Sequence, residues 1–137
     1  MKYDKAIEWA TALRSGKYEQ GEGRLTTIRD LKEKDCCLGV ACKVAIESGI
    51  NIEITKKSSG WDSDGPTYRV EYNGEGCTLA SDLLKDVREY LGIKSASGKI
   101  ETRLWDQELE FELTVLNDSD FDFNQIADVI EFFWEEL

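Results

Sequence analysis

Histidine is absent from this 137-residue chain. Histidine is the commonest general base and the commonest metal ligand in proteins, so its absence argues against the usual catalytic and metal sites. The sequence also has no nucleophile elbow and no metal-binding motif, and we therefore predict a protein that is not an enzyme. No apolar run approaches the roughly 18 residues that a membrane-spanning helix needs. The first residues also lack the apolar stretch of a secretory signal, so we expect a cytoplasmic protein without a membrane partner.

Four cysteines are present, and in the cytoplasm their thiols are expected to stay reduced. Cys36, Cys37 and Cys42 fall on or at the start of one apolar segment, and we interpret them as small buried side chains. A zinc site that adds Cys77 satisfies the number of ligands and leaves a zinc-stabilised module as an alternative. No two cysteines are separated by two residues, however, so we predict no metal and no cofactor. Cys36, at an expected helix start, is the thiol for which we predict a lowered pKa.

The negative charge is concentrated in one part of the chain. The formal net charge is −11, and residues 101–137 contain 12 acidic residues and one basic residue, whereas residues 1–100 contain 16 of each. Such an excess argues against direct nucleic-acid binding by the C-terminal segment. It favours a partner with a basic surface, or high solubility alone.

The segment 35–49 predicts a central helix. Its apolar residues form two adjacent stripes at helical spacing and leave few polar positions, so other elements must cover several sides of this helix. Asp35 is expected to cap the first turn, and Gly49 to follow the last. Gly39 lies inside the helix, where glycine costs roughly 1 kcal/mol relative to alanine, and we expect another backbone to pack closely there. The two stripes are Leu38, Ala41, Cys42, Ala45 and Ile46, and Cys37, Val40 and Val44.

Similar patterns place the other elements. Amphipathic periodicity predicts helices over 4–15 and 81–91 and a last helix that follows a capping box at Asp122 and Gln125. The expected strands are 25–28, 50–55, 68–72 and 105–113. We expect the second and third of these strands to pair antiparallel. The expected loops and turns are 16–24, 29–34, 56–67, 73–76 and 94–99. We therefore predict one compact α+β domain over residues 1–137, with about four helices around a small, mostly antiparallel sheet.

The predicted strand 105–113 alternates apolar and acidic residues. Its acidic side chains would lie on one face, where like charges in a row repel each other. A segment that repeatedly breaks local rules is a candidate functional surface. The candidate partner-binding surface comprises Asp106, Glu108, Glu110, Glu112, Asp118, Asp120, Glu131 and Glu135.

A glycine-containing loop is the second candidate site. Its backbone amides and the guanidinium groups that follow could hold an anion. It does not match the phosphate-binding loop known as the P-loop, because no strand precedes it, no Lys-Ser or Lys-Thr follows it and Glu22 has the wrong charge. The candidate ligand-binding residues are Tyr18, Gln20, Gly21, Gly23, Arg24 and Arg29.

The acidic positions 118, 120 and 122 begin like a calcium loop. Phe123 then stands where that loop needs glycine, and Val129 stands where it needs a bidentate glutamate. We therefore assign these aspartates to a turn and a helix cap.

Three blocks of the sequence form a recognisable pattern. They are Trp9-x3-Leu13-Arg14-Ser15-Gly16-x-Tyr18-x-Gln20-Gly21-x-Gly23-x-Leu25, then Cys36-Cys37-Leu38-Gly39-Val40-x-Cys42, then Leu116-Asn117-Asp118 with Phe123-x2-Ile126-Ala127-Asp128-x-Ile130-Glu131. In this order they resemble a family of small proteins encoded by bacteriophages and prophages. The resemblance implies an intracellular phage accessory protein, without a particular reaction, and a short helical turn around Leu116. Leu79-Ala80 departs from the Leu-Pro that the family usually carries before its third helix.

Two hypotheses follow from the sequence. In the first, the protein inhibits a host defence factor by placing its acidic surface, as an imitation of nucleic acid, on a basic surface of that factor. In the second, the Gly21–Gly23 loop and Arg24 bind and sequester a small ligand such as a nucleotide signal. The sequence is compatible with a homo-oligomer in either case.

Overall fold

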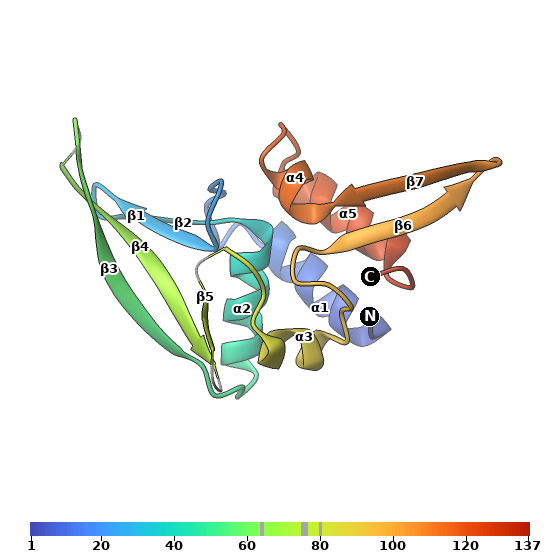
Figure 1. The fold of residues 1–137 in the computed structure, drawn as a ribbon, viewed down its shortest axis with the longest axis horizontal. Coiled ribbons are helices and arrows are strands. Elements are labelled where there is room, and N and C mark those ends of the chain that lie inside the picture. The colour runs from blue at the N-terminus through green and yellow to red at the C-terminus, as the bar shows by residue number, and fades with distance from the viewer. Residues whose placement is uncertain (64, 75–76, 80) are drawn as a thin grey trace.

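The fold is arranged around an apolar helix, α2 (Cys37–Glu47), which lies between a sheet and the remaining helices (Figure 1). The computed structural model describes residues 1–63, 65–74, 77–79 and 81–137. The other elements are α1 (Tyr3–Arg14), β1 (Thr26–Arg29), β2 (Lys32–Asp35), β3 (Glu53–Asp62), β4 (Gly65–Gly74), β5 (Cys77–Leu79), α3 (Lys85–Leu91), β6 (Lys99–Leu104), β7 (Gln107–Glu112), α4 (Leu113–Asn117) and α5 (Phe123–Phe133). The predicted α+β class is confirmed.

Helix α2 is buried along most of its length, as its two apolar stripes predict. Gly39 faces the backbone just before β1, and a methyl group at this position would overlap the carbonyl oxygen of Leu25. The predicted close backbone approach at Gly39 is therefore confirmed. The predicted cap is wrong, because Cys36 occupies the N-cap position and Asp35 belongs to β2. The Cys36 amide donates instead to the Leu25 carbonyl, at 3.0 Å.

The main sheet has five antiparallel strands, in the order β2-β1-β4-β3 with β5 also paired to β4. The predicted antiparallel pairing of the second and third expected strands is confirmed as β3 with β4. The predicted loop 56–67 is wrong, because residues 56–62 belong to β3 and residues 65–67 to β4, and the two strands form a long hairpin. Its Ser-Ser-Gly sequence forms an irregularity between Ser58 and Gly60, where the register shifts.

The charged turn expected over 29–34 is also wrong. Arg29 pairs with Lys32, so residues 29–35 contribute the end of β1, a two-residue turn and all of β2. Strand β2 contains no apolar side chain, so its sequence lacks the alternation of apolar and polar residues that predicts a strand. The turn expected at 73–76 and the Leu79-Ala80 position fall partly outside the described residues.

Near the C-terminus, a separate two-stranded sheet replaces the single predicted strand 105–113. Residues 99–104 form β6, although Lys99 was predicted to belong to the loop 94–99. Trp105 and Asp106 form the turn, and β7 begins at Gln107. Leu113 starts the short helix α4, which is the helical turn implied by the phage-family resemblance.

The last two long helices differ in how well their starts were predicted. Helix α3 begins at Lys85 instead of Ser81, and Leu84 at its N-cap makes no capping hydrogen bond through its side chain. Helix α5 begins as predicted, because Asp122 and Gln125 form both hydrogen bonds of a capping box. Among the described residues, no helix is long and apolar enough to cross a membrane.

One hydrophobic cluster connects all of these layers. The indole of Trp9 in α1 is fully buried and donates to the Cys37 carbonyl of α2, at 3.0 Å. Helix α5 packs its buried face, which includes Ile126 and Ile130, on the far side of α1. Tyr72 and Val70 of β4 close the core from the sheet side.

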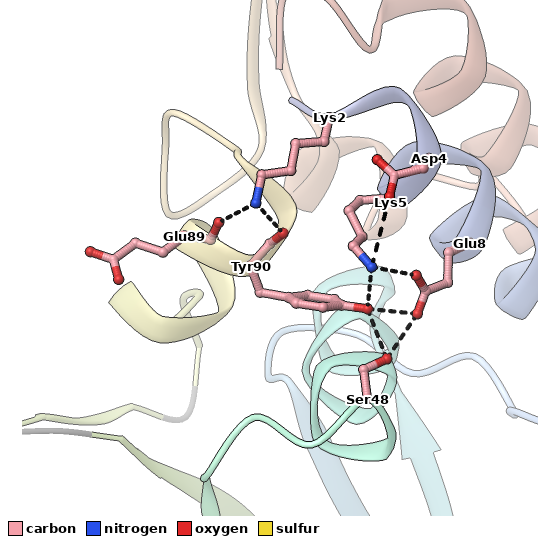
Figure 2. Close-up of polar contacts among 7 residues, drawn as sticks. All are labelled: Lys2, Asp4, Lys5, Glu8, Ser48, Glu89 and Tyr90. Atoms are coloured by element: carbon pink, nitrogen blue, oxygen red, sulfur yellow. Dashed lines mark hydrogen bonds and ion pairs between the residues drawn. The ribbon is translucent and has the colours of Figure 1, made fainter.

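A polar network joins three helices at one edge of this core (Figure 2). The Tyr90 hydroxyl of α3 donates to Glu8 of α1 at 2.7 Å and accepts from Lys5 at 3.0 Å, while Ser48 after α2 also donates to Glu8. Hydrogen bonds to Tyr90 and Glu8 raise the pKa of Lys5. Burial opposes ionisation of Glu8, but hydrogen bonds from Tyr90, Lys5 and Ser48 outweigh it and lower the Glu8 pKa. Both charges therefore persist at neutral pH, and Tyr90 and Ser48 connect them to α3 and to the end of α2.

The contact at Gly39 gives a test of the fold. In an ordinary helix, Gly→Ala stabilises by about 1 kcal/mol. Here we expect Gly39→Ala to lower the free energy of unfolding by about 3 kcal/mol or more, because the new methyl group meets the Leu25 backbone. Urea unfolding followed by circular dichroism measures the change.

The matched control is Gly23→Ala. Gly23 has a φ of 77°, and a methyl group there has no atom within 4 Å, so only backbone strain of about 1 kcal/mol is expected. A Gly39→Ala variant as stable as the original protein would contradict the proposed packing of β1 against α2.

Candidate functional site

The hairpin formed by β6 and β7, residues 99–112, is hereafter the arm. Figure 1 shows it extending beyond α5, away from the main sheet. The base of the arm is fixed by Ile100, which is fully buried, and by Phe111, whose ring packs edge-to-face on Phe133 with centroids 5.4 Å apart. All residues from 103 to 110 are exposed. Most of the arm therefore contributes surface and little core.

The strand register brings the predicted carboxylates onto one face. Glu108 lies opposite Arg103, Glu110 opposite Glu101, and Glu112 opposite Lys99. The face thus carries four carboxylates and two cations and is acidic without being uniformly negative. The Lys99 ammonium forms ion pairs with Glu101 and Glu110, and these hydrogen bonds raise its pKa.

The turn of the arm places an aromatic side chain in solvent. Trp105 and Asp106 have φ values of 47° and 65°, the left-handed region that two-residue hairpin turns normally fill with Asn-Gly. A bulky residue in this conformation costs about 1–2 kcal/mol. Trp105 is nonetheless 97% exposed and has no core to pack against. Asp106 therefore belongs to the tip of the arm and not to the ladder of glutamates.

The other four acidic candidates lie elsewhere. Asp118, before α5, accepts hydrogen bonds from the Gly23 amide and from Asn117, and thereby connects two loops. Asp120, with a φ of 63°, is exposed in the same turn. Glu131 forms an ion pair with Arg14 of α1, and Glu135 is exposed after α5. The structure thus groups Asp106, Glu108, Glu110 and Glu112 on the arm and disperses the remainder.

The glycine loop uses its own amides within the fold. The Gly21 amide donates to the Asp35 carbonyl at 2.8 Å, and the Gly23 amide donates to Asp118 at 3.1 Å. The Gln20 side chain donates to the Phe121 carbonyl at 2.7 Å. Glycine is needed at position 21 because a Cβ atom there would lie 2.9 Å from that of Lys34. These amides are therefore not available to an anion.

The candidate ligand-binding residues fall into two groups. Gln20, Gly21, Arg24 and Arg29 line one cavity of about 840 Å³ beside the main sheet. Tyr18 instead lines a cavity of about 360 Å³, where its ring lies 5.6 Å from the Lys43 ammonium. Gly23 lines neither cavity. The structure therefore brings four of the six residues together.

A buried polar cluster beneath Tyr18 was missed from the sequence. Asp35 is only 2% exposed, and its carboxylate accepts from Thr26 and from Lys43, the latter at 2.8 Å. The Thr26 hydroxyl also contacts that of Tyr72, at 2.6 Å. Burial raises the pKa of Asp35, although Lys43 and Thr26 oppose this effect. With both oxygens bonded, Asp35 serves to connect β2 to β1 and α2, and no sequence motif distinguishes this role from capping.

The thiols that the structure describes are buried. Cys36, Cys37 and Cys42 all pack in the core, which agrees with their interpretation as small apolar side chains. The prediction of a lowered pKa for Cys36 is wrong, because burial raises it to about 11. The side chain of Cys77 lies outside the described part of the chain. Within that part, no group of three or more Cys, Asp or Glu residues is arranged to hold a metal ion.

Comparison with known families places the chain in one of them. Residues 1–133 match the family described as Domain of unknown function (DUF8296), and the chain belongs to this family. No curated protein is significantly similar to it. No solved structure matches it either. The family match covers all three sequence blocks that carry the phage-family resemblance, and its description assigns no origin or activity.

Burial of the thiols predicts their chemical behaviour. In a Cys77→Ser variant, we expect no measurable reaction of the folded protein with Ellman's reagent at mildly alkaline pH, because the thiolate is the reactive form and burial disfavours it. Three thiols should react after denaturation. Rapid reaction of one thiol in the folded state would show that Cys36 is accessible and activated after all.

Proposed function

We propose that this member of the DUF8296 family is a non-enzymatic accessory protein that binds and inhibits a host protein through its acidic arm. The observation that carries the proposal is the exposure of every residue from 103 to 110, with a tryptophan at the tip. Tryptophan is among the residues that contribute most to binding energy in protein interfaces. An exposed tryptophan in a strained turn has no evident benefit for folding, so a benefit in binding explains it best.

The charge of the arm supports a basic partner. Five carboxylates and two cations lie between residues 99 and 112, and residues 101–137 account for the whole net charge of −11. Such a surface accelerates association with a basic patch and repels acidic competitors. Proteins that bind nucleic acid carry basic patches of this kind, so occupation of the patch would compete with nucleic acid.

The resemblance to phage and prophage proteins supports a host target and a cytoplasmic place of action. A small protein expressed by a phage can act by stoichiometric occlusion, without turnover.

Charge reversal on the arm tests this function. The original protein, recovered gently from the bacterial host at low salt, is expected to carry a stoichiometric partner in native mass spectra. We expect the Glu108→Lys/Glu110→Lys variant, recovered in the same way, to carry at least tenfold less of this partner. The complex should dissociate as salt is raised. The purified partner should bind nucleic acid alone and lose this binding when the original protein is added.

The matched control is Asp4→Lys/Glu89→Lys, which changes the net charge equally on exposed positions of α1 and α3. It should retain the partner. Recovery of the same partner in the same amount with the arm variant, or a complex that leaves the partner's nucleic-acid binding intact, would contradict the proposal.

A further inference from the structure

The outer face of the main sheet, opposite α2, is basic. Val70 and Tyr72 of β4 face the core, so the alternate residue Arg69 faces outward. The strand pairing identifies the other residues on this face. One row of paired residues across the strands consists of Lys34, Thr27, Arg69 and Lys57. The next row on the same face consists of Lys32, Arg29 and Thr67. Five cations therefore lie in these two rows of a protein whose formal net charge is −11, although Arg69 forms an ion pair with Glu71 of the neighbouring row, at 3.1 Å.

The loop before β1 converts part of this face into a cavity. Residues 20–24 run beside β2, fixed by the pairing of Gly21 with the Asp35 carbonyl. The resulting cavity, of about 840 Å³, is lined by Arg24 from the loop and by Arg29, Lys32 and Lys34 from the first two strands. Its volume is within the range of small-molecule sites, which runs from roughly 300 to 1,000 Å³.

Two of the four cations are not neutralised within the fold. Arg29 forms an ion pair with Asp62 at 2.7 Å, and Lys34 is 3.8 Å from Glu19. Arg24 and Lys32 are exposed and form no ion pair with any other residue that the structure describes. Clustered like charges repel each other, so a bound anion would relieve this repulsion.

We infer that this cavity binds a nucleotide, with its phosphates against Arg24 and Lys32. A guanidinium group binds phosphate through two parallel hydrogen bonds, and a lysine adds a mobile point charge. Glu22 and Asp30 also line the cavity. Their carboxylates repel a bare phosphate but accept hydrogen bonds from ribose hydroxyls and base amino groups, which favours a nucleotide over an inorganic anion. This site is separate from the arm.

The inference is tested by calorimetric titration of the whole protein with ATP. We expect saturable binding by the original protein and at least a tenfold weaker affinity for the Arg24→Ala/Lys32→Ala variant. Both side chains are exposed and without an ion pair, so the variant should fold, and thermal unfolding checks this. The control Lys56→Ala/Lys85→Ala removes the same charge from outside the cavity and should bind ATP as the original protein does.

Two further titrants distinguish the source of the negative charge. Inorganic triphosphate should bind at least tenfold more weakly than ATP, and equal binding would overturn the nucleotide assignment. Tighter binding of a single-stranded oligonucleotide, lost in the same cavity variant, would assign the face to nucleic acid instead. Absence of ATP binding at millimolar concentration, or equal losses in the cavity and control variants, would also overturn the inference.

Discussion

Helix α2 is apolar on nearly all sides, and the rest of the structure depends on covering it. Coverage on one side requires the chain before β1 to pass directly against the helix, which is possible only because Gly39 has no side chain. That contact positions β1, and β1 in turn fixes β2 and β4 by pairing. On the other sides, α1, α3 and α4 pack against the same helix. The basic face of the sheet therefore depends on α2 through this contact and through the packing of β2 on the same helix.

The same arrangement separates opposite charges. The basic outer face belongs to the sheet on one side of α2, and the acidic arm lies beyond the helices on the other, as Figure 1 shows. Large apolar side chains are also exposed near the ends of three hairpins: Leu31 at 95%, Trp61 at 80% and Trp105 at 97%. Because the core is complete without them, these side chains are available for contacts with other molecules.

The sequence predicts the parts of this fold that follow a regular apolar period. The helices at Trp9, Gly39 and Ile126 were found for this reason, whereas the capping box at Asp122 was found from its pairing with Gln125. Strand β2 was not predicted because it contains no apolar residue. The ends of β3 and β4 were not predicted because the sequence around the irregularity at Gly60 resembles a loop. The arm was found as one strand, because alternation along β7 does not reveal its partner.

The candidate sites were predictable to different degrees. Arg24 and Arg29 could be selected from the sequence, whereas Lys32 and Lys34 join them only through strand pairing. The buried bond between Asp35 and Lys43 likewise depends on a strand that gives no signal. Glu108 and Glu110 were correctly placed on one face, but the cations Lys99 and Arg103 on that face become evident only from the register.

The central claim is that the arm carries Trp105 for binding and not for folding. The most direct measurement is the free energy of unfolding of a Trp105→Asn/Asp106→Gly variant, which gives the turn the residues that its left-handed backbone prefers. The account predicts that this variant is more stable than the original protein, by about 1 kcal/mol, because strain is relieved and no buried contact is lost. A loss of stability would contradict the account, because it would show that Trp105 contributes to the fold itself.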